Sequence, residues 1–237
     1  MIQGELFRES TLHMSDIPLT GDGAQVEWGS LLSGKIMVVA AILLILLNLP
    51  NFFKIAASVI ECMRIARANS TLEHSYNQAT IRNRTAWTQL LPLALLADRF
   101  DLIHPAFYDK IPVVWHAPMT LGIILAYLLV RLIIRLFLMP RRVSSETSDT
   151  AHRILFTMAI ALSAVALCTT GIMLVAGASD SSIRSVLIWE TALLFFLSLI
   201  RTGQILGSQC HGFSTFLYLC ALEMIPAACL IAATTIF

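Results

Sequence analysis

Glu223 occupies the position in this sequence that raises the clearest chemical question. It lies in the stretch YLCALEMIP (218–226), near the middle of the last hydrophobic segment of the chain. A carboxylate at the centre of a bilayer is costly unless it is paired, protonated or hydrated. We therefore expect this side chain either to meet a cation from another helix or to take part in moving protons or solutes.

Arginines in two other hydrophobic segments are the natural partners of Glu223. Arg131 and Arg135 are four residues apart, a spacing that places both on one face of a helix. At about 1.5 Å of rise per residue, Arg131 and Arg201 come to depths near that of Glu223, and Arg135 lies one turn closer to the surface. The sequence predicts an intramembrane cluster of these four residues, with Arg131 or Arg201 as the ion-pair partner where their helices are neighbours.

Pro226 follows Glu223 by three residues and adds a second polar feature to the same turn. Proline has no N–H group, so a backbone carbonyl about one turn earlier loses its helical donor, and a kink is expected. In a membrane helix such a carbonyl is tolerated where neighbouring groups or water satisfy it. Three interpretations stay open: an ion pair that fixes helix register, a transport or proton site, and a contact with protein or lipid.

A second polar pair is expected toward the other membrane surface. Glu190 lies about one to two turns inside one hydrophobic segment, and His116 lies at a similar depth in another. A histidine beside a carboxylate titrates near neutral pH, which would suit a pH-dependent function. The alternative is a polar rim at the membrane interface without a special role.

Motifs for catalysis, metal binding and haem ligation are absent from the sequence. It contains no HExxH or GxSxG pattern, and its five cysteines form no CxxC pair. Bundle cytochromes need inward histidines at matching depths on facing helices, whereas His116 is the only histidine within a predicted span. The formal net charge of +1 indicates no basic surface of the kind that binds nucleic acid. We expect no enzyme activity, cofactor, metal site or nucleic-acid partner.

Composition indicates that these polar residues are carried by membrane helices. Hydrophobic residues make up 57% of the chain and charged residues 13%, well below the roughly one quarter that is usual in soluble proteins. A membrane-spanning helix needs about 20 mostly apolar residues. The sequence predicts an all-α polytopic membrane protein of about six transmembrane helices, at 31–49, 85–97, 112–138, 154–177, 185–206 and 213–237. Segment 85–97 is short for a crossing, so it either spans with its acidic end at the interface or re-enters.

Residues 51–67 predict a helix of a different character. Pro50 suits the end of the first span. After it, apolar residues such as Phe53 and Ile60 recur at helical spacing, while Lys54 and Arg64 gather on another face. This pattern is typical of an interfacial amphipathic helix that is attracted to anionic lipid. An ordinary amphipathic packing helix fits the pattern equally well.

The distribution of Lys and Arg predicts the orientation in the membrane. Basic residues concentrate in segments 50–84 and 139–153, and short basic loops face the cytoplasm. Six spans with both termini in the periplasm put both segments on that side, whereas five spans would separate them. We expect a bacterial inner-membrane protein with a polar N-terminal tail at 1–30 and a single helical domain at 31–237. The tail has no basic start like that of a cleavable signal, so the first hydrophobic segment is expected to remain as a helix.

The C-terminal stretch FLYLCALEMIPAACL (216–230) resembles the ending of an uncharacterised family of polytopic membrane proteins from Bacteroidetes, a domain of unknown function. That family ends in apolar residues with a Tyr, a Leu-Cys pair, a Glu and a Pro. The matching residues are Tyr218, Leu219, Cys220, Glu223 and Pro226. The resemblance implies an inner-membrane protein and supplies no substrate, cofactor or reaction. The short second span at 85–97 departs from the family pattern.

Two functions are compatible with these observations. Polar residues inside the predicted spans are few for a conventional transporter, which favours a structural or accessory membrane component that acts through partners. Those partners would be the lipid bilayer and other membrane proteins or further copies of the chain. The alternative is a small proton-coupled carrier or permease using Glu223, Arg131 and Arg201. Carriers usually contain paired broken helices, and Pro226 has only Pro92 as a candidate mate.

Overall fold

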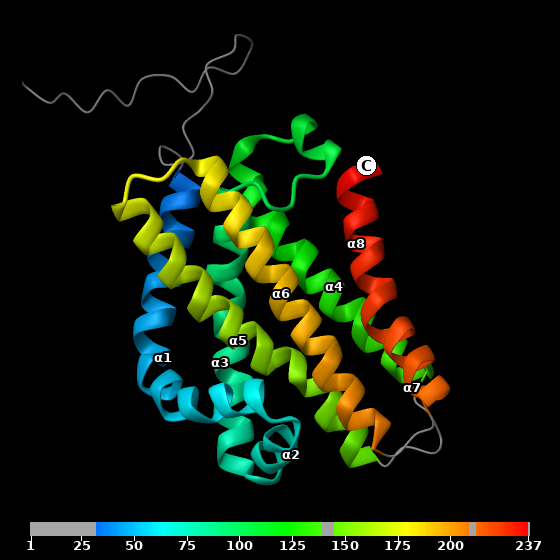
Figure 1. Ribbon diagram of the computed structural model, residues 1–237. Coiled ribbons are helices and arrows are strands. Elements are labelled where there is room, and N and C mark those ends of the chain that lie inside the picture. Colours follow the sequence, from blue (N-terminus) through cyan, green and yellow to red (C-terminus); the bar gives the residue numbers. More distant parts are fainter. Residues whose placement is uncertain (1–31, 139–144, 209–211, 237) are drawn as a thin grey trace, which may run out of the picture.

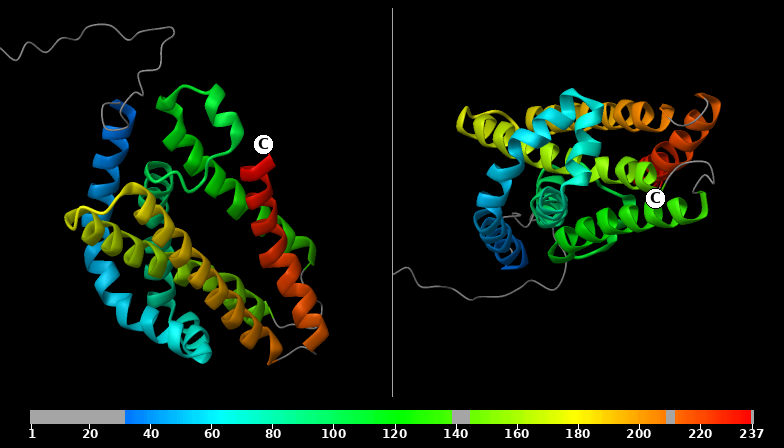
Figure 2. Two further views of the ribbon diagram at one scale, coloured as in Figure 1. Left: turned by 45° about the horizontal axis from the view of Figure 1, so that its top comes forward. Right: turned by 90° about the horizontal axis from the view of Figure 1, so that it is seen from below.

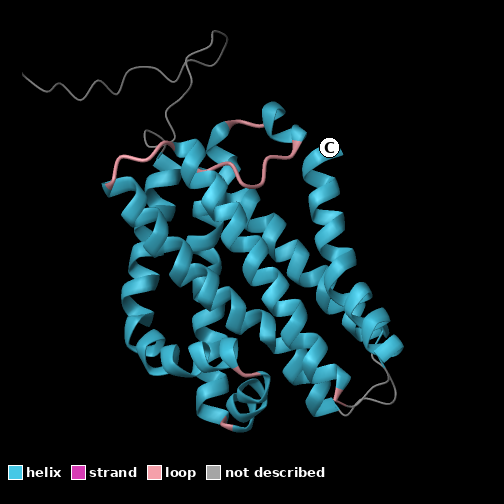
Figure 3. Ribbon diagram, viewed as in Figure 1, coloured by secondary structure: helices cyan, strands magenta, loops and turns pink. Residues whose placement is uncertain are grey.

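The computed structural model describes residues 32–138, 145–208 and 212–236, and the regular structure within these ranges is entirely helical (Figures 1 and 3). The long helices are α1 (Leu32–Arg64), α3 (Tyr76–Arg99), α4 (His116–Leu138), α5 (Ser145–Val175) and α6 (Asp180–Gly207). Shorter elements are α2 (Ala66–His74), η2 (Ala106–Lys110), η3 (Val113–Trp115), α7 (Gly212–Leu219) and α8 (Ile225–Ile236). A π-helical turn, η4 (Cys220–Met224), joins α7 to α8. The expected all-α fold is confirmed.

Five helical segments in the described part of the chain are long and apolar enough to cross a membrane. They are Gly34–Arg64, Val113–Phe137, Asp149–Val175, Asp180–Gly207 and Thr215–Ala232. Their outward faces are apolar as well, since Leu47, Phe137 and Trp189 expose most of their side chains. Apolar surface exposed on this scale suits contact with lipid and would drive association in water. By length and composition the chain therefore has the helices of a multi-pass membrane protein.

Helix α3 differs from the short second span that the sequence predicts at 85–97. It is 24 residues long, because the polar residues before Thr85 continue the helix instead of forming a loop. At about 1.5 Å per residue this length matches a hydrocarbon core of roughly 30 Å. Its composition keeps it out of the five apolar segments. It lies between α1, α4 and α5, so that protein surrounds much of its surface (Figure 2).

The contacts of α3 show how a polar helix is accommodated at this central position. The buried Gln89 accepts a hydrogen bond through Oε1 from the hydroxyl of Ser163 on α5, at 2.6 Å. Three residues earlier on α3, Ala86 packs with Ile160 of α5 and Ile55 of α1. Small and hydroxyl-bearing residues of this kind let membrane helices approach closely and bond to one another.

Pro50 lies inside α1, whereas the sequence predicts that the first span ends there. A proline within a helix removes one hydrogen bond and bends the axis. Figure 1 shows the second part of α1 turning to run across the end of the bundle. Here Ile55 and Val59 are buried against α3 and α5, while Phe53 and Ile60 face outward. The helix predicted at 51–67 is therefore the second part of α1 together with the start of α2.

Successive long helices alternate in direction, which collects the basic segments at one end of the bundle (Figure 1). This basic end comprises α2, the last turns of α1, α4 and α6, and the first turns of α3, α5 and α7. Its described basic residues are Lys54, Arg64, Arg67, Arg82, Arg84, Arg135, Arg153 and Arg201. The first turn of α1 and the last turn of α8 both lie at the opposite end.

Candidate functional site

Arg131 of α4 and Glu223 of the π-helical turn form an ion pair inside the bundle. Arg131 Nη2 donates a hydrogen bond to Glu223 Oε1, and both side chains are 0% exposed. Helix α4 packs along η4 and α8, which brings together two residues that are 92 positions apart. Of the two arginines considered as partners of Glu223, the structure places Arg131 against it.

The backbone at Glu223 is widened by the π-helical turn. The N–H group of Ile225 donates to the carbonyl of Cys220, five residues earlier, and Pro226 follows with no N–H group to donate. One carbonyl of this turn is consequently left without a helical donor. The structure thus has a π-helical turn where the sequence predicts a kink, and such turns are frequent at functional sites.

The buried pair is only partly satisfied by protein groups. Nε and Nη1 of Arg131 and Oε2 of Glu223 have no hydrogen-bond partner within the described ranges. The hydroxyl of Tyr218 and Nδ1 of His152 are also buried and also lack a hydrogen-bond partner within the described ranges. Tyr218 packs against Leu222, the neighbour of Glu223, and His152 lies within reach of the Arg131 charge. The polar region inside the bundle therefore extends beyond the two paired residues.

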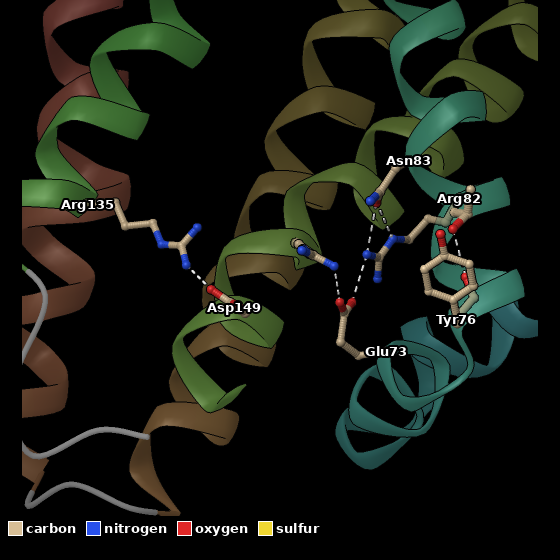
Figure 4. A network of polar contacts seen from close by, with 8 residues as sticks. Glu73, Tyr76, Arg82, Asn83, Arg135 and Asp149 are labelled. Atoms are coloured by element: carbon tan, nitrogen blue, oxygen red, sulfur yellow. Dashed lines mark hydrogen bonds and ion pairs between the residues drawn. The ribbon is translucent and has the colours of Figure 1, made fainter. Parts of the chain in front are cut away.

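Arg135, one turn along α4 from Arg131, has a partner of its own. It pairs with Asp149 near the start of α5 (Figure 4). The side chain of Asp149 is 42% exposed, so this pair lies nearer the surface of the bundle than the fully buried Arg131–Glu223 pair. Along α4, Arg135 and its pair thus lie closer to the basic end, and Arg131 and its buried pair lie one turn further into the bundle.

Arg201 is engaged away from Glu223. Its Nε and Nη2 donate to the carbonyl of Met63 at 3.1 and 2.6 Å, and Nη2 also donates to the carbonyl of Arg64 at 2.7 Å. Its Nη1 donates to Gln204 Oε1 at 2.8 Å. The last carbonyls of a helix have no intrahelical donor, and a cation is favourable there. The predicted four-residue cluster is therefore divided, because Arg201 caps the end of α1.

Sequence reasoning missed a network at the basic end that joins three helices. Glu73 of α2 accepts hydrogen bonds from Arg82 of α3 and from Arg153 of α5 (Figure 4). Arg82 also donates to Asn83 Oδ1, at 3.1 Å from Nε and 3.0 Å from Nη2, and its side chain is 2% exposed. The segment around Glu73 is polar and predicts a loop, so only the charges themselves signalled a possible pairing.

His116 and Glu190, the predicted outer pair, have different partners in the structure. His116 Nε2 lies 3.2 Å from the carbonyl oxygens of Tyr108 and Ile111, and its ring stacks on that of Tyr108. Glu190 Oε2 accepts a hydrogen bond from Thr169 on α5 at 3.2 Å. His116 therefore fixes the loop before α4, while Glu190 contributes to the packing of α6 on α5.

The loop between α3 and α4 is held by the same kind of polar contact. The hydroxyl of Tyr108 lies 3.0 Å from Thr120 Oγ1, and Thr120 donates to Asp98 at the end of α3. Burial raises the pKa of the Tyr108 phenol, so this side chain stays neutral and hydrogen-bonded at physiological pH. On the surface nearby, Arg99 pairs with Asp180 at 3.1 Å, linking α3 to α6.

The described residues contain no group of three His, Cys, Asp and Glu side chains placed to hold a metal ion. Comparison with models of protein families, with curated proteins and with solved structures found no match for this chain. The distinctive chemical feature of the molecule is thus the buried pair of Arg131 and Glu223. Such a pair can lock two helices together, or it can exchange a proton if water reaches it.

Proposed function

We propose that the chain is an inner-membrane protein of a bacterium with six transmembrane helices and both termini in the periplasm. The sixth crossing is α3, in addition to the five apolar segments. Support comes from its length, its central position and the gathering of basic residues at one end of the bundle. Basic loops stay in the cytoplasm, which assigns the basic end to that side. The resemblance of residues 216–230 to a Bacteroidetes membrane family agrees with this location.

The second part of α1 serves as the interfacial segment in this arrangement. Its outward face combines apolar Phe53 and Ile60, 68% and 58% exposed, with the exposed basic residues Lys54 and Arg64. The bend after Pro50 lets this part run along the membrane surface rather than through it. Apolar burial and attraction to anionic headgroups would then hold it at the cytoplasmic interface.

We infer that the protein works as a structural or accessory membrane component through contacts with other membrane proteins. The observation that carries this proposal is the fully buried Arg131–Glu223 pair, which neutralises both charges within the chain. Arg135 and Arg201 are likewise engaged by groups of the same chain. Because these side chains hold helices of the same chain together, the surfaces that can bind other membrane proteins are the apolar outer faces of the helices and the basic end.

A small proton-coupled carrier is the second candidate, and one observation favours it. Glu223 lies in a π-helical turn next to Pro226, and one of its carboxylate oxygens has no partner in the described ranges. A carrier would use this carboxylate alternately charged and neutral, with Arg131 releasing it during part of the cycle.

The two candidates are separated by an experiment on a variant that lacks the pair. Glu223→Gln combined with Arg131→Gln removes both charges and strands neither. Crosslinking in native membranes followed by mass spectrometry should recover the same neighbouring proteins from this variant and from the wild type. Reconstituted vesicles carrying an internal pH dye should show no Glu223-dependent proton flux. Flux that depends on Glu223, without specific crosslinks, would replace the accessory role by the carrier.

A further inference from the structure

The Arg131–Glu223 pair has both donors and acceptors that lack a hydrogen-bond partner in the described ranges. Arg131 Nε and Nη1 are donors only, and Glu223 Oε2 is an acceptor only. The hydroxyl of Tyr218 can do either, and a carbonyl of the π-helical turn adds a further acceptor. All three side chains are more than nine-tenths buried. Inside a membrane protein, polar groups in this condition require a partner.

The charge of the site limits what that partner can be. Arg131 and Glu223 together are neutral, so an added anion is repelled by Glu223 and an added cation by Arg131. An apolar molecule offers no hydrogen bond. Water both donates and accepts, and a buried water molecule typically makes about three hydrogen bonds to otherwise unsatisfied polar groups. It is the species whose bonding matches the free donors and acceptors.

A polar route leads from the pair to the basic end. Arg135 and Asp149 form the next pair along α4 and α5, and Asp149 is half exposed. His152, one turn further along α5, has a buried nitrogen without a partner in the described ranges. The charges of Arg131, Arg135, Arg153 and Asp149 all act on His152, so its ring lies in the neighbourhood of both pairs.

We propose that ordered water molecules bind to the unpartnered atoms of Arg131 and Glu223, forming a hydrated site inside the bundle that opens toward the basic end. This inference goes beyond the proposed function, because water would serve a structural ion pair as well as a proton-handling one. It gives Glu223 contact with the aqueous phase on one side of the membrane only.

Radical footprinting of the protein in lipid nanodiscs tests the hydration. A brief X-ray pulse converts bound water into hydroxyl radicals, which oxidise the side chains beside it, and mass spectrometry gives the rate for each residue. Leu222 and Leu187 are matched, since they are 1% and 2% exposed and lie in different parts of the bundle. We expect Leu222 to be modified severalfold faster than the matched Leu187 if water is bound beside it. Equal rates would show that the site is dry.

A variant with an apolar pair checks that the charged residues hold this water. Arg131→Met combined with Glu223→Leu keeps similar volumes and strands no ion. The oxidation rate of Leu222 should then fall to that of Leu187, and an unchanged rate would overturn the assignment of the water to this pair. If the variant does not fold, the comparison within the wild type still decides whether water is present.

Thiol labelling tests the direction of the opening. In a chain whose native cysteines are replaced, Ile134→Cys places a thiol at a partly buried position that packs against the cluster containing Leu222 and Tyr218. Leu129→Cys is the control, on the exposed face of the same helix. A charged methanethiosulfonate reagent reacts only with hydrated thiols. We expect it to modify Ile134→Cys from the side of the basic end and to leave Leu129→Cys unmodified. Reaction of Ile134→Cys from neither side, or only from the opposite side, would contradict the opening.

Discussion

Arg131 and Glu223 carry opposite charges, and neither side chain is exposed to solvent. The free-energy cost of burying each charge therefore depends on the presence of the other. Two charges moved out of water regain much of that cost through their mutual attraction, whereas one charge left without its partner regains nothing. The pair therefore tolerates removal of both charges far better than removal of one. The same reasoning applies to Arg82, which is almost fully buried and depends on Glu73.

Glu223→Gln should destabilise the protein strongly, because it leaves Arg131 charged and unpaired. Loss of one partner of a buried pair costs about 3–5 kcal/mol, a large part of a total stability of roughly 5–15 kcal/mol. Adding Arg131→Gln should restore much of the thermal stability measured after purification in detergent. Adding Arg201→Gln instead should not, since the nitrogens of Arg201 bond to Met63, Arg64 and Gln204. A normally stable Glu223→Gln variant would favour proton handling over a structural pair.

Glu73→Gln should also lower stability, by about 3 kcal/mol, because it removes the acidic partner of the buried Arg82 and of Arg153. Glu61→Gln is the matched control, because Glu61 is exposed on α1 and such surface changes usually stay within about 0.5 kcal/mol. Denaturant or thermal unfolding of the two variants in the same detergent provides the comparison. Equal stability of the two would mean that the network at the basic end contributes little.

At the scale of elements, the end of α1 depends on a side chain from α6. Arg201 provides donors to the last carbonyls of α1, at the negative end of the helix dipole. The bend at Pro50 brings this end beneath the bundle, within reach of α6 (Figure 1). Helices α1 and α6 are thus joined through one guanidinium group, which a prediction from helical periodicity does not anticipate.

Arg201→Gln should loosen the end of α1 and the following α2 without disturbing the buried pair. Hydrogen bonds to a charged group contribute about 1.5–3 kcal/mol, so amide hydrogen exchange in residues 61–70 should speed up by roughly tenfold or more. Arg184→Gln, at the opposite end of α6, is the control and should leave this segment unchanged. Exchange in residues 61–70 that is insensitive to Arg201→Gln would show that α1 and α2 are held by packing instead.

On the scale of the whole molecule, the orientation of the helices in the membrane depends on whether α3 crosses it. Residues 76 and 110 flank α3 and its following loop, and both Tyr76 and Lys110 are exposed. In a cysteine-free background, Lys110→Cys should react with an impermeant maleimide in intact spheroplasts. Tyr76→Cys should react only after permeabilisation, because it lies at the basic end, which we propose faces the cytoplasm. Labelling of both positions from the same side would show that α3 does not cross and would reverse the orientation of the helices on one side of it.

The sequence by itself determined the properties that depend on local composition. Long apolar segments become helices because the backbone must satisfy its own hydrogen bonds where water is absent, so the all-α fold and most helix positions could be predicted. Relative height along the bundle could be predicted too, since the rise per residue in a helix is constant. Counting along the predicted spans put Arg131 at a depth near that of Glu223, and the structure places the two in contact.

The tertiary structure decided which neighbour each polar group meets, because packing sets the rotation and order of the helices and depth does not. Arg201 was an equally plausible partner for Glu223 by depth, yet it faces the end of α1. From the sequence, the span at 85–97 is short and polar for a membrane crossing. A helix that is enclosed by protein, as α3 is, does not need an apolar surface, and this could be seen only once its neighbours were known. The sequence did not predict the pairing of Glu73 with Arg82, because that contact depends on how α2 packs against α3 and α5. The prolines predicted a helix end at Pro50 and a kink at Pro226. Only the surrounding helices decided that the chain bends within α1 at Pro50 and forms a π-helical turn before Pro226.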